Sequence, residues 1–298
     1  MATQPARVHL VDGTFELFRA HYTQRPGHRA PDGSEKKATV GLAFAIVELL
    51  RDRLEAVTHL AVAFDNPIRS FRNALFAGYK TDDGMDPELR GQFDAAEEAV
   101  RALGITVWSM DEFEADDALA TGAARYAAEV DQVRILTPDK DLGQCLDGTQ
   151  VVTVDRIRKS VTDEAALLAR RGIKPESVPD FLALTGDEAD GIPGVAGFGE
   201  KTAGALLQRY LHLEQIPKQP REWPAGVRGA LRLAAALEAA GEEVLLYRKL
   251  ATLRRDVPLP EPLPALEWRG VPRAGFEAWC EKLGVAELAA RVPRFCEP

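Results

Sequence analysis

The stretch Glu114-Ala115-Asp116-Asp117 places three carboxylates within four positions, shortly after the apolar segment 105–110. Like charges at this spacing repel one another, so a fold keeps them only where they are solvated, cap a helix or surround a cation. Acidic residues in the first turn of a helix suit its macrodipole, so this stretch alone favours a cap. Carboxylates elsewhere in the chain decide whether it also belongs to a metal site.

Short apolar segments alternate with helical ones through the first half of the chain. The segments that we expect to be buried strands are 7–12, 60–65, 105–110, 132–137 and 150–154. Helical periodicity is predicted over 37–53 and 118–128, and the charged segment 66–103 is also expected to be helical. Such alternation predicts an α/β fold with a mostly parallel sheet and helices on both faces. Ligands of such sheets gather outside the carboxyl ends of the strands.

Four of the predicted strands end at or lead into acidic residues. We therefore expect one acidic cluster at that edge, formed by Asp12, Asp65, Glu114, Asp116, Asp117, Asp139 and Asp141. Seven carboxylates do not share a small space without compensating charge. Oxygen ligands without Cys or His indicate hard cations, Mg²⁺ or Mn²⁺, rather than zinc.

The segment 180–202 is predicted to be a helix, a glycine-rich hairpin and a second helix. Gly194, Gly197 and Gly199 allow the backbone to approach a ligand closely, and the helix that follows directs its N-terminus outward. Such a hairpin can grip a nucleic-acid phosphate, although an ordinary inter-helix loop has the same composition. Asp187 and Asp190 precede it, at a spacing that would let them complete the acidic cluster.

Composition indicates a globular protein of one large or two modest domains. The 298 residues are 46% hydrophobic, and the three Cys and five His show no paired metal-ligand spacing. Without a secretory signal or a membrane-spanning run, we expect a cytoplasmic protein. The formal charge is -9, and residues 170–298 are balanced, with 18 basic and 18 acidic residues. The whole acidic excess is therefore in residues 1–169, where bound cations would offset it.

The tail, residues 211–298, is predicted to form amphipathic helices over 229–240 and 242–253. The proline-rich stretch 257–264 is expected to be an extended surface connector. Trp223, Trp268 and Trp279 are interpreted as packing residues.

Taken together and in this order, these residues resemble the 5′ nuclease family of flap endonucleases and of the 5′ to 3′ exonuclease domain of bacterial DNA polymerase I. The motifs are Val11-Asp12-Gly13, Phe64-Asp65, Ser70-Phe71-Arg72, Tyr79-Lys80, Glu114–Asp117, Thr137–Leu142 and Leu184–Thr202. They cover about two thirds of the chain, and their joint occurrence is specific.

The resemblance implies a PIN-like nuclease domain over 1–170, with a helical arch at about 66–103. It also implies a helical domain over 171–298, with a helix-three-turn-helix DNA-binding element at about 177–210. In the family, the equivalents of Asp12, Asp65, Glu114 and Asp116 hold one divalent ion, and those of Asp117, Asp139, Asp141, Asp187 and Asp190 serve a second. The hairpin would bind duplex DNA through a K⁺-bridged phosphate.

The resemblance also implies roles for basic, aromatic and hairpin residues. Arg72, Lys80 and Arg19 would neutralise phosphates, and Tyr79 would stack on a base near the unpaired end. The expected DNA-binding hairpin residues are Gly194, Val195, Gly197, Gly199, Lys201 and Thr202. For Lys140 and Lys201, the alternative interpretation is that they are solvated lysines.

Two positions depart from the family pattern. The arginine common four residues after the arch tyrosine is Asp83 here, with Arg90 as a possible substitute, and the asparagine expected after Asp190 is Gly191. An Asp-Gly-Thr phosphatase of the haloacid-dehalogenase type is excluded, since Leu10 stands where its nucleophilic aspartate would be. A simple PIN-type ribonuclease lacks a segment such as 180–202.

We therefore expect a Mg²⁺- or Mn²⁺-dependent nuclease that acts on DNA, or on RNA–DNA, with a 5′ flap, nick or gap. It is expected to be a monomer that works at the nucleoid without contacting a membrane, and its length leaves no room for a polymerase domain. The alternative is a branched-DNA-binding protein of the same fold with weak or no catalysis.

Overall fold

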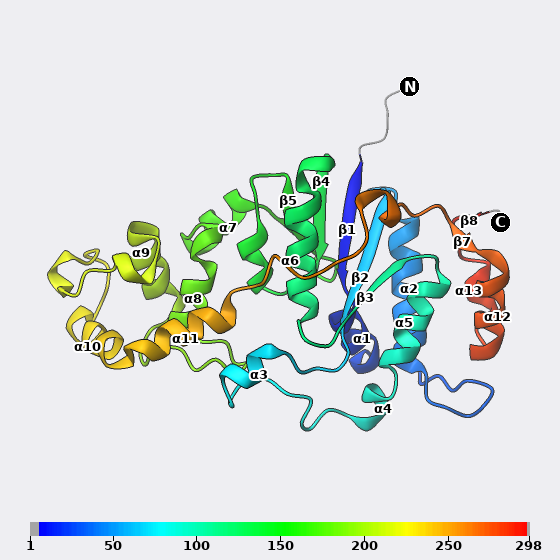
Figure 1. Ribbon diagram of the computed structural model, residues 1–298, viewed down its shortest axis with the longest axis horizontal. Coiled ribbons are helices and arrows are strands. Elements are labelled where there is room, and N and C mark those ends of the chain that lie inside the picture. The colour runs from blue at the N-terminus through cyan, green and yellow to red at the C-terminus, as the bar shows by residue number, and fades with distance from the viewer. Residues whose placement is uncertain (1–5, 297–298) are drawn as a thin grey trace. The chain divides into compact units, whose positions relative to one another are not determined.

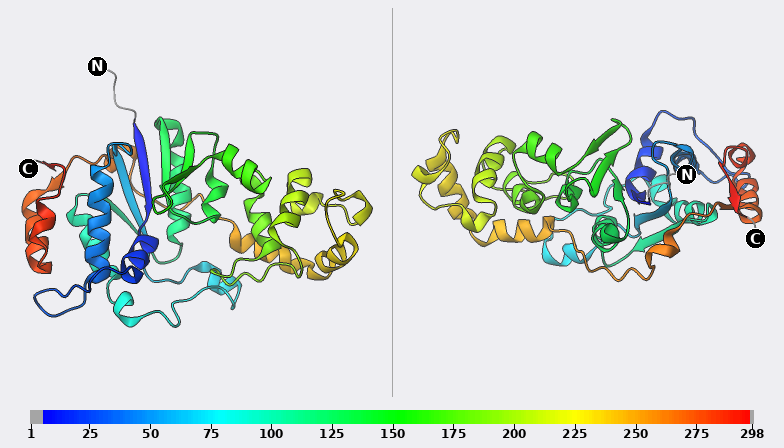
Figure 2. Two further views of the ribbon diagram at one scale, coloured as in Figure 1. Left: turned by 180° about the vertical axis from the view of Figure 1, so that it is seen from behind. Right: turned by 90° about the horizontal axis from the view of Figure 1, so that it is seen from above.

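The computed structural model describes residues 6–296, which form two compact units (Figures 1 and 2). The first unit contains the chain up to Arg69, Asp82–Thr137, and Arg255 onward. The second contains Ser70–Thr81 and Pro138–Arg254. The second unit thus begins before the expected division near residue 170, because the chain from Pro138 onward packs within it. The last segment returns to the first unit, where the backbone amide of Trp268 donates to the Thr58 carbonyl at 2.9 Å.

The first unit is an α/β structure built around four parallel strands. Its elements are β1 (Arg7–Asp12), α1 (Gly13–Tyr22), α2 (Lys37–Arg51), β2 (His59–Asp65), α4 (Pro87–Arg90), α5 (Phe93–Ala102), β3 (Thr106–Met110), α6 (Ala115–Tyr126), β4 (Gln132–Leu136), β7 (Val271–Pro272), α12 (Arg273–Leu283), α13 (Ala286–Ala289) and β8 (Phe295–Cys296). β7 and β8 form a separate two-stranded parallel sheet.

Within the first unit the strand order is β3-β2-β1-β4. β1 pairs in parallel with both β2 and β4, and β2 pairs in parallel with β3. Helices α1 and α2 lie between β1 and β2 in the chain, and α5 lies between β2 and β3. Helix α2 packs against both α1 and α5. Helix α6 connects β3 back to β4 and packs on β1, β2 and β3, so it covers the opposite face. The predicted fold class is confirmed.

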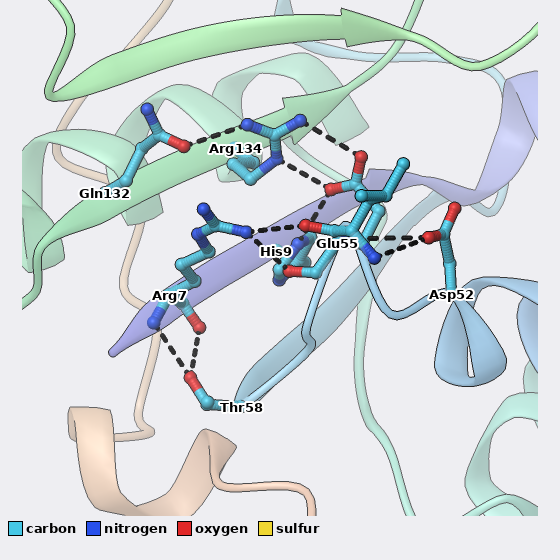
Figure 3. Close-up of polar contacts among 8 residues, drawn as sticks. Arg7, His9, Asp52, Glu55, Thr58, Gln132 and Arg134 are labelled. Atoms are coloured by element: carbon cyan, nitrogen blue, oxygen red, sulfur yellow. Dashed lines mark hydrogen bonds and ion pairs between the residues drawn. The ribbon is translucent and has the colours of Figure 1, made fainter. Parts of the chain in front are cut away.

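A buried charge network holds the start of β1 against its neighbours (Figure 3). Arg134 on β4 makes two hydrogen bonds to the Glu55 carboxylate, from Nε at 2.6 Å and from Nη2 at 3.0 Å. His9 on β1 is fully buried, and its Nε2 lies 3.1 Å from the same carboxylate. Burial lowers the pKa of His9, so the neutral ring donates from Nε2 to the acceptor-only carboxylate.

The second unit is mainly helical and has its own core. Its elements are α3 (Phe71–Leu75), β5 (Val151–Asp155), β6 (Ser160–Thr162), α7 (Glu164–Arg171), α8 (Val178–Thr185), α9 (Glu200–Tyr210), α10 (Ala230–Ala240) and α11 (Glu242–Ala251). Within it, β5 and β6 form an antiparallel pair, and α8 packs against both α9 and α11. Phe181 and Leu182 of α8 are 1% and 0% exposed, so this short helix lies at the centre of the unit's core.

The predicted elements are confirmed to within a few residues, with particular exceptions. Helix α6 begins at Ala115 rather than at Ala118, because Glu114 caps it. Segment 66–103, which was expected to be helical, forms three short helices, α3, α4 and α5, separated by non-helical chain. Strands β6, β7 and β8 were not predicted. The three tryptophans of the tail are buried as expected, at 5–6% exposure. Within residues 6–296, no helix has the length and apolar character needed to cross a bilayer.

Candidate active site

Two of the expected site residues, Asp12 and Asp65, are at the carboxyl ends of β1 and β2 in the first unit. Asp12 is 8% exposed and caps α1, because its Oδ1 accepts a hydrogen bond from the Phe15 amide at 2.8 Å. Its Oδ2 accepts another from Thr137 Oγ1 at 3.0 Å. Asp65 Oδ1 accepts from the Ala115 amide at 2.8 Å and so joins the end of β2 to the start of α6. Both carboxylates are therefore held by backbone amides.

The acidic stretch Glu114–Asp117 forms the N-terminal cap and first turn of α6. Glu114 and Asp117 form a capping box, in which Asp117 Oδ2 accepts from the Glu114 amide at 3.0 Å. Their exposures are 5% and 0%, whereas Asp116 is half-buried. The cap interpretation is thus confirmed for this pair, and Asp117 has a positioning contact with Glu114. The helix N-terminus also favours the negative charges gathered beside it.

A second acidic group lies within the second unit, where Asp141 is the most buried member. Asp139 Oδ1 accepts from the Asp141 amide at 2.8 Å, which fixes the turn between them. Asp141 is 4% exposed, and among the described residues its buried Oδ1 has no hydrogen-bond partner. Burial raises the pKa of Asp141 well above its usual value, and the charges of Asp139, Asp190 and Asp187 raise it further. A cation among these carboxylates would relieve that cost.

Two lysines neutralise the aspartates that precede the hairpin. Lys140 Nζ lies 2.9 Å from Asp187 Oδ2, and Lys80 Nζ lies 2.9 Å from Asp190 Oδ1. Burial opposes the charge of Lys140, but the hydrogen bond and the charge of Asp187 raise its pKa above the usual value. Lys140 is therefore more than a solvated lysine: its side chain is 36% exposed, but its ammonium pairs with an aspartate of the acidic group.

As the side chains stand, no three His, Cys, Asp or Glu residues within 6–296 are arranged to share one metal ion. Backbone amides and lysines already occupy several of the carboxylate oxygens. The chemical type of these side chains nevertheless suits a hard divalent cation, because all of their donor atoms are carboxylate oxygens. The Asp141 Oδ1, which has no hydrogen-bond partner among the described residues, is buried beside further acidic side chains.

The predicted phosphate-binding and stacking residues have mixed environments. Arg72 is 1% exposed, and its guanidinium donates to the carbonyls of Leu250 and Thr252 at 2.7 and 3.0 Å. It does not have the surface position expected of a phosphate ligand, because it anchors the C-terminal end of α11. Tyr79 is 3% exposed and belongs to the core of the second unit, so its ring has no face for the expected base stacking. Arg19 pairs with Glu16, and Lys80 remains 27% exposed.

The arch position that departs from the family pattern is open to solvent. The Asp83 side chain is 80% exposed and lies 4.0 Å from Arg69. Arg90, the suggested substitute for the missing arginine, is engaged with Asp82 at 2.9 Å.

The glycine-rich hairpin is fixed at one end and exposed at the other. Gly194 has φ +72°, and a Cβ there would lie 2.4 Å from the Gly186 nitrogen. The Val195 amide donates to the Leu184 carbonyl at 2.8 Å, and Val195 is 5% exposed. Gly197, Gly199 and Lys201 are exposed, and Gly199 caps α9, with Thr202 in the first turn. The exposed backbone next to a helix N-terminus is available to an anion.

Arg171, the last residue of α7, was not singled out by any sequence motif. Its Nη1 is buried without a hydrogen-bond partner among the described residues, and burial lowers its pKa. The charges of Asp141 and Asp139 act in the opposite direction, which places this guanidinium within electrostatic reach of the acidic group. An arginine in the last turn of a helix ordinarily indicates only a favourable dipole interaction.

Residues 7–172 match the family described as "5'-3' exonuclease, N-terminal resolvase-like domain", and residues 173–274 match "5'-3' exonuclease, C-terminal SAM fold". The chain belongs to the 5′-3′ exonuclease family. Curated relatives include DNA polymerase I of Bacillus caldotenax, 34% identical over 92% of this chain, and DNA polymerase I of Mycobacterium tuberculosis, 36% identical over 87%. The alignments cover 31% and 29% of those proteins, so the chain spans about a third of their length.

Solved structures of lower identity share the fold of this 5′-3′ exonuclease family member. T5 D15 protein co-crystallized with metal ions has a TM-score of 0.63 and 19% identity, over 95% of this chain and 99% of that one. The catalytic core of Rad2 in complex with DNA substrate also has a TM-score of 0.63, at 15% identity over 97% and 92%. Human GEN1 in complex with Holliday junction DNA has the same TM-score, at 15% identity over 96% and 71%.

Proposed function

We propose that this chain is a divalent-metal-dependent, structure-specific 5′ nuclease. It hydrolyses phosphodiester bonds at or near the 5′ ends of flapped, nicked or gapped DNA, as a monomer in the cytoplasm at the nucleoid. Family membership supports the nuclease class. The observation that carries metal dependence is the buried, unpartnered oxygen of Asp141 among further carboxylates.

We assign to each unit a set of carboxylates whose oxygens suit a divalent cation, Mg²⁺ or Mn²⁺. In the first unit these are Asp12, Asp65, Glu114 and Asp116, with Asp117 holding Glu114 in place. In the second unit they are Asp139, Asp141, Asp187 and Asp190. When bound, such cations lower the pKa of a water molecule and stabilise charge on phosphate oxygens.

The basic residues near these sets have separate tasks. Lys80, 27% exposed and next to Asp190, supplies a positive charge to the phosphate that is cleaved or to its neighbour. Lys140 offsets the charge of Asp187. Arg72 serves as an anchor, since its donors bind carbonyls at the end of α11.

The exposed hairpin around Gly197 and Gly199 would bind a phosphate of the duplex through K⁺, supported by the N-terminus of α9 and by Lys201. Replacing K⁺ by Li⁺ at constant ionic strength should then weaken binding of an unflapped duplex. Equal affinity in the two salts would exclude the potassium bridge.

A 5′-labelled flap duplex tests the activity most directly. We expect Mn²⁺ or Mg²⁺ to produce short labelled fragments from the 5′ flap, and we expect EDTA to abolish them. A matched 3′-flap duplex should remain intact. Absence of any metal-dependent product would refute the enzyme and leave the alternative, a branched-DNA-binding protein, which selective binding of the flap would identify.

Asp139→Asn tests the acidic group without disturbing its turn. The asparagine oxygen can still accept from the Asp141 amide, so the fold should persist while one charge is lost. We expect cleavage to fall on the order of 100-fold or more. Flap binding without divalent ions should stay nearly unchanged. Asp147→Asn is the matched control, because Asp147 is an exposed aspartate of the same unit. Full activity in Asp139→Asn would place the metal site elsewhere.

A further inference from the structure

The segment Gly78–Lys80, at the base of the expected arch, is held against the turn between Asp187 and Ile192. The Lys80 amide donates to the Asp190 carbonyl at 3.1 Å. The Lys80 carbonyl accepts from Asn73 Nδ2 at 2.9 Å. Both polar groups of the Lys80 backbone are thus bonded within the second unit, although the residues that follow, from Asp82, belong to the first.

The side chains of the same segment contact both oxygens of one carboxylate. Lys80 Nζ lies 2.9 Å from Asp190 Oδ1, and the Tyr79 hydroxyl donates to Asp190 Oδ2 at 3.2 Å. Because the Tyr79 ring is buried in the core of the unit, the hydroxyl has a fixed position. The orientation of the Asp190 carboxylate therefore depends on where this segment lies.

Close backbone contact at Gly191 makes this arrangement possible. Gly191 has φ +72°, and a Cβ there would lie 2.1 Å from the Gly78 carbonyl oxygen. Ordinary contact begins at 3.4 Å, so any side chain would push the two segments about 1.3 Å apart. Gly78 is itself restricted, since its Cβ would lie 2.7 Å from the Phe76 ring.

We infer that Gly191 is a positioning residue: its missing side chain lets Gly78–Lys80 lie on the turn, and this sets the Asp190 carboxylate and the Lys80 ammonium in one fixed arrangement. The contact itself is independent of activity, whereas its consequence for cleavage rests on the proposed nuclease function. Gly191 would thereby link the base of the arch to the acidic group of the second unit.

Gly191→Ala and Gly229→Ala form a matched pair for the test. Gly229 also has φ +72°, so alanine causes the same backbone strain there, but its Cβ would meet nothing within 4 Å. Amide hydrogen exchange of Lys80, followed by NMR or mass spectrometry, reports the contact directly. We expect exchange to speed up at least about tenfold in Gly191→Ala and to stay unchanged in Gly229→Ala. Equal exchange in the two variants would overturn the inference.

Kinetics provide the second measurement. A displacement of about 1 Å can reduce kcat on the order of 100-fold. We expect that loss in Gly191→Ala, with a smaller change in flap-duplex Kd because the exposed hairpin residues Gly197 and Gly199 are unchanged, and no kcat loss in Gly229→Ala. If wild-type protein cleaves nothing, the proposed nuclease function fails, while the exchange comparison still decides the role of Gly191. A weakened Kd with normal kcat would contradict a positioning role.

Asn73→Asp keeps the inference testable if Gly191→Ala does not fold. Asn73 Oδ1 accepts from the Ser70 amide in the capping box of α3, and an aspartate oxygen preserves that bond. The donor to the Lys80 carbonyl is lost. We expect faster exchange at Lys80 in this variant, and wild-type exchange there would show that the segment is not held as inferred.

Discussion

Glu55→Gln tests the buried charge network at the start of β1 and β4. The change preserves the shape of the side chain, but one amide oxygen cannot replace a carboxylate that accepts from His9 and twice from Arg134. Although burial favours the neutral acid, these hydrogen bonds hold the pKa of Glu55 at about 2, against 4.5 normally. The difference of about 2.5 corresponds to about 3.4 kcal/mol at 1.36 kcal/mol per pKa unit.

The expected loss of unfolding free energy at pH 7 is about 2–4 kcal/mol. The Glu55 side chain is 14% exposed, so solvent screening reduces the pair energy only modestly. Removing one partner also leaves the Arg134 guanidinium, 11% exposed, without its counter-charge. A double replacement, Glu55→Leu with Arg134→Met, should recover part of the loss, because no unpaired buried charge remains.

The pH dependence has a definite sign. The Glu55 pKa is lower in the folded protein, so the unfolded chain takes up the proton first as the pH falls. The contribution of Glu55 is therefore complete above about pH 4.5 and is lost as the pH falls toward about 2. Burial lowers the pKa of His9 below 6.5, so its contribution is complete above 6.5 and declines below that pH. In Glu55→Gln, the loss of unfolding free energy between about pH 4.5 and about pH 2 should therefore be absent.

Tryptophan fluorescence can report the first unit alone. Trp108, Trp268 and Trp279 belong to that unit and Trp223 to the other, so urea unfolding in a Trp223→Phe background follows the first unit. Glu48→Gln is the control, since Glu48 is 48% exposed and forms only surface ion pairs. It should change the unfolding free energy by less than about 0.5 kcal/mol. An equally small effect in Glu55→Gln would refute the reasoning.

Two further substitutions follow from the packing and from the arch. Gly122→Ala should destabilise the first unit by about 1–3 kcal/mol, because its Cβ would lie 2.8 Å from the Trp108 ring. Gly275→Ala, also helical but with nothing within 4 Å, should instead stabilise by about 0.5–1 kcal/mol; equal effects in urea unfolding would contradict this difference. Asp83→Arg should raise flap affinity or cleavage, because the exposed side chain then attracts phosphate. The exposed Asp111→Arg serves as its charge-matched control, and equal rates in wild type and Asp83→Arg would mean that another basic residue already fills the role.

The sequence predicted the strand ends well because parallel buried strands are continuous apolar runs with a polar residue where they stop. Asp12 and Asp65 are the last residues of β1 and β2, as expected. The return of the last segment to the first unit was not predictable in the same way. Residues 255–296 return to the first unit through contacts such as Tyr126 to the Glu261 carbonyl at 2.6 Å, and such long-range contacts leave no local pattern.

The environments of single side chains were the least predictable part of the site. Arg72 and Tyr79 lie in motifs that imply exposed roles, yet both are buried by segments distant in sequence. Burial of an arginine depends on finding acceptors, and the carbonyls of Leu250 and Thr252 lie some 180 positions away. The sequence showed Gly191 as a departure from the family pattern. The reason for the glycine is the nearby Gly78 carbonyl, which is distant in sequence and comes close only in the folded chain.

Capping and metal binding need not be alternatives for the stretch Glu114–Asp117. Asp12 and Glu114 both stand where a parallel strand gives way to a helix, at the N-caps of α1 and α6. The amides of that first turn hold the carboxylates in place and, through the helix dipole, reduce their mutual repulsion. Each carboxylate still has further lone pairs, so a cap occupies only part of its capacity. Helix capping therefore assembles, before any cation binds, the negative site that a divalent cation would complete.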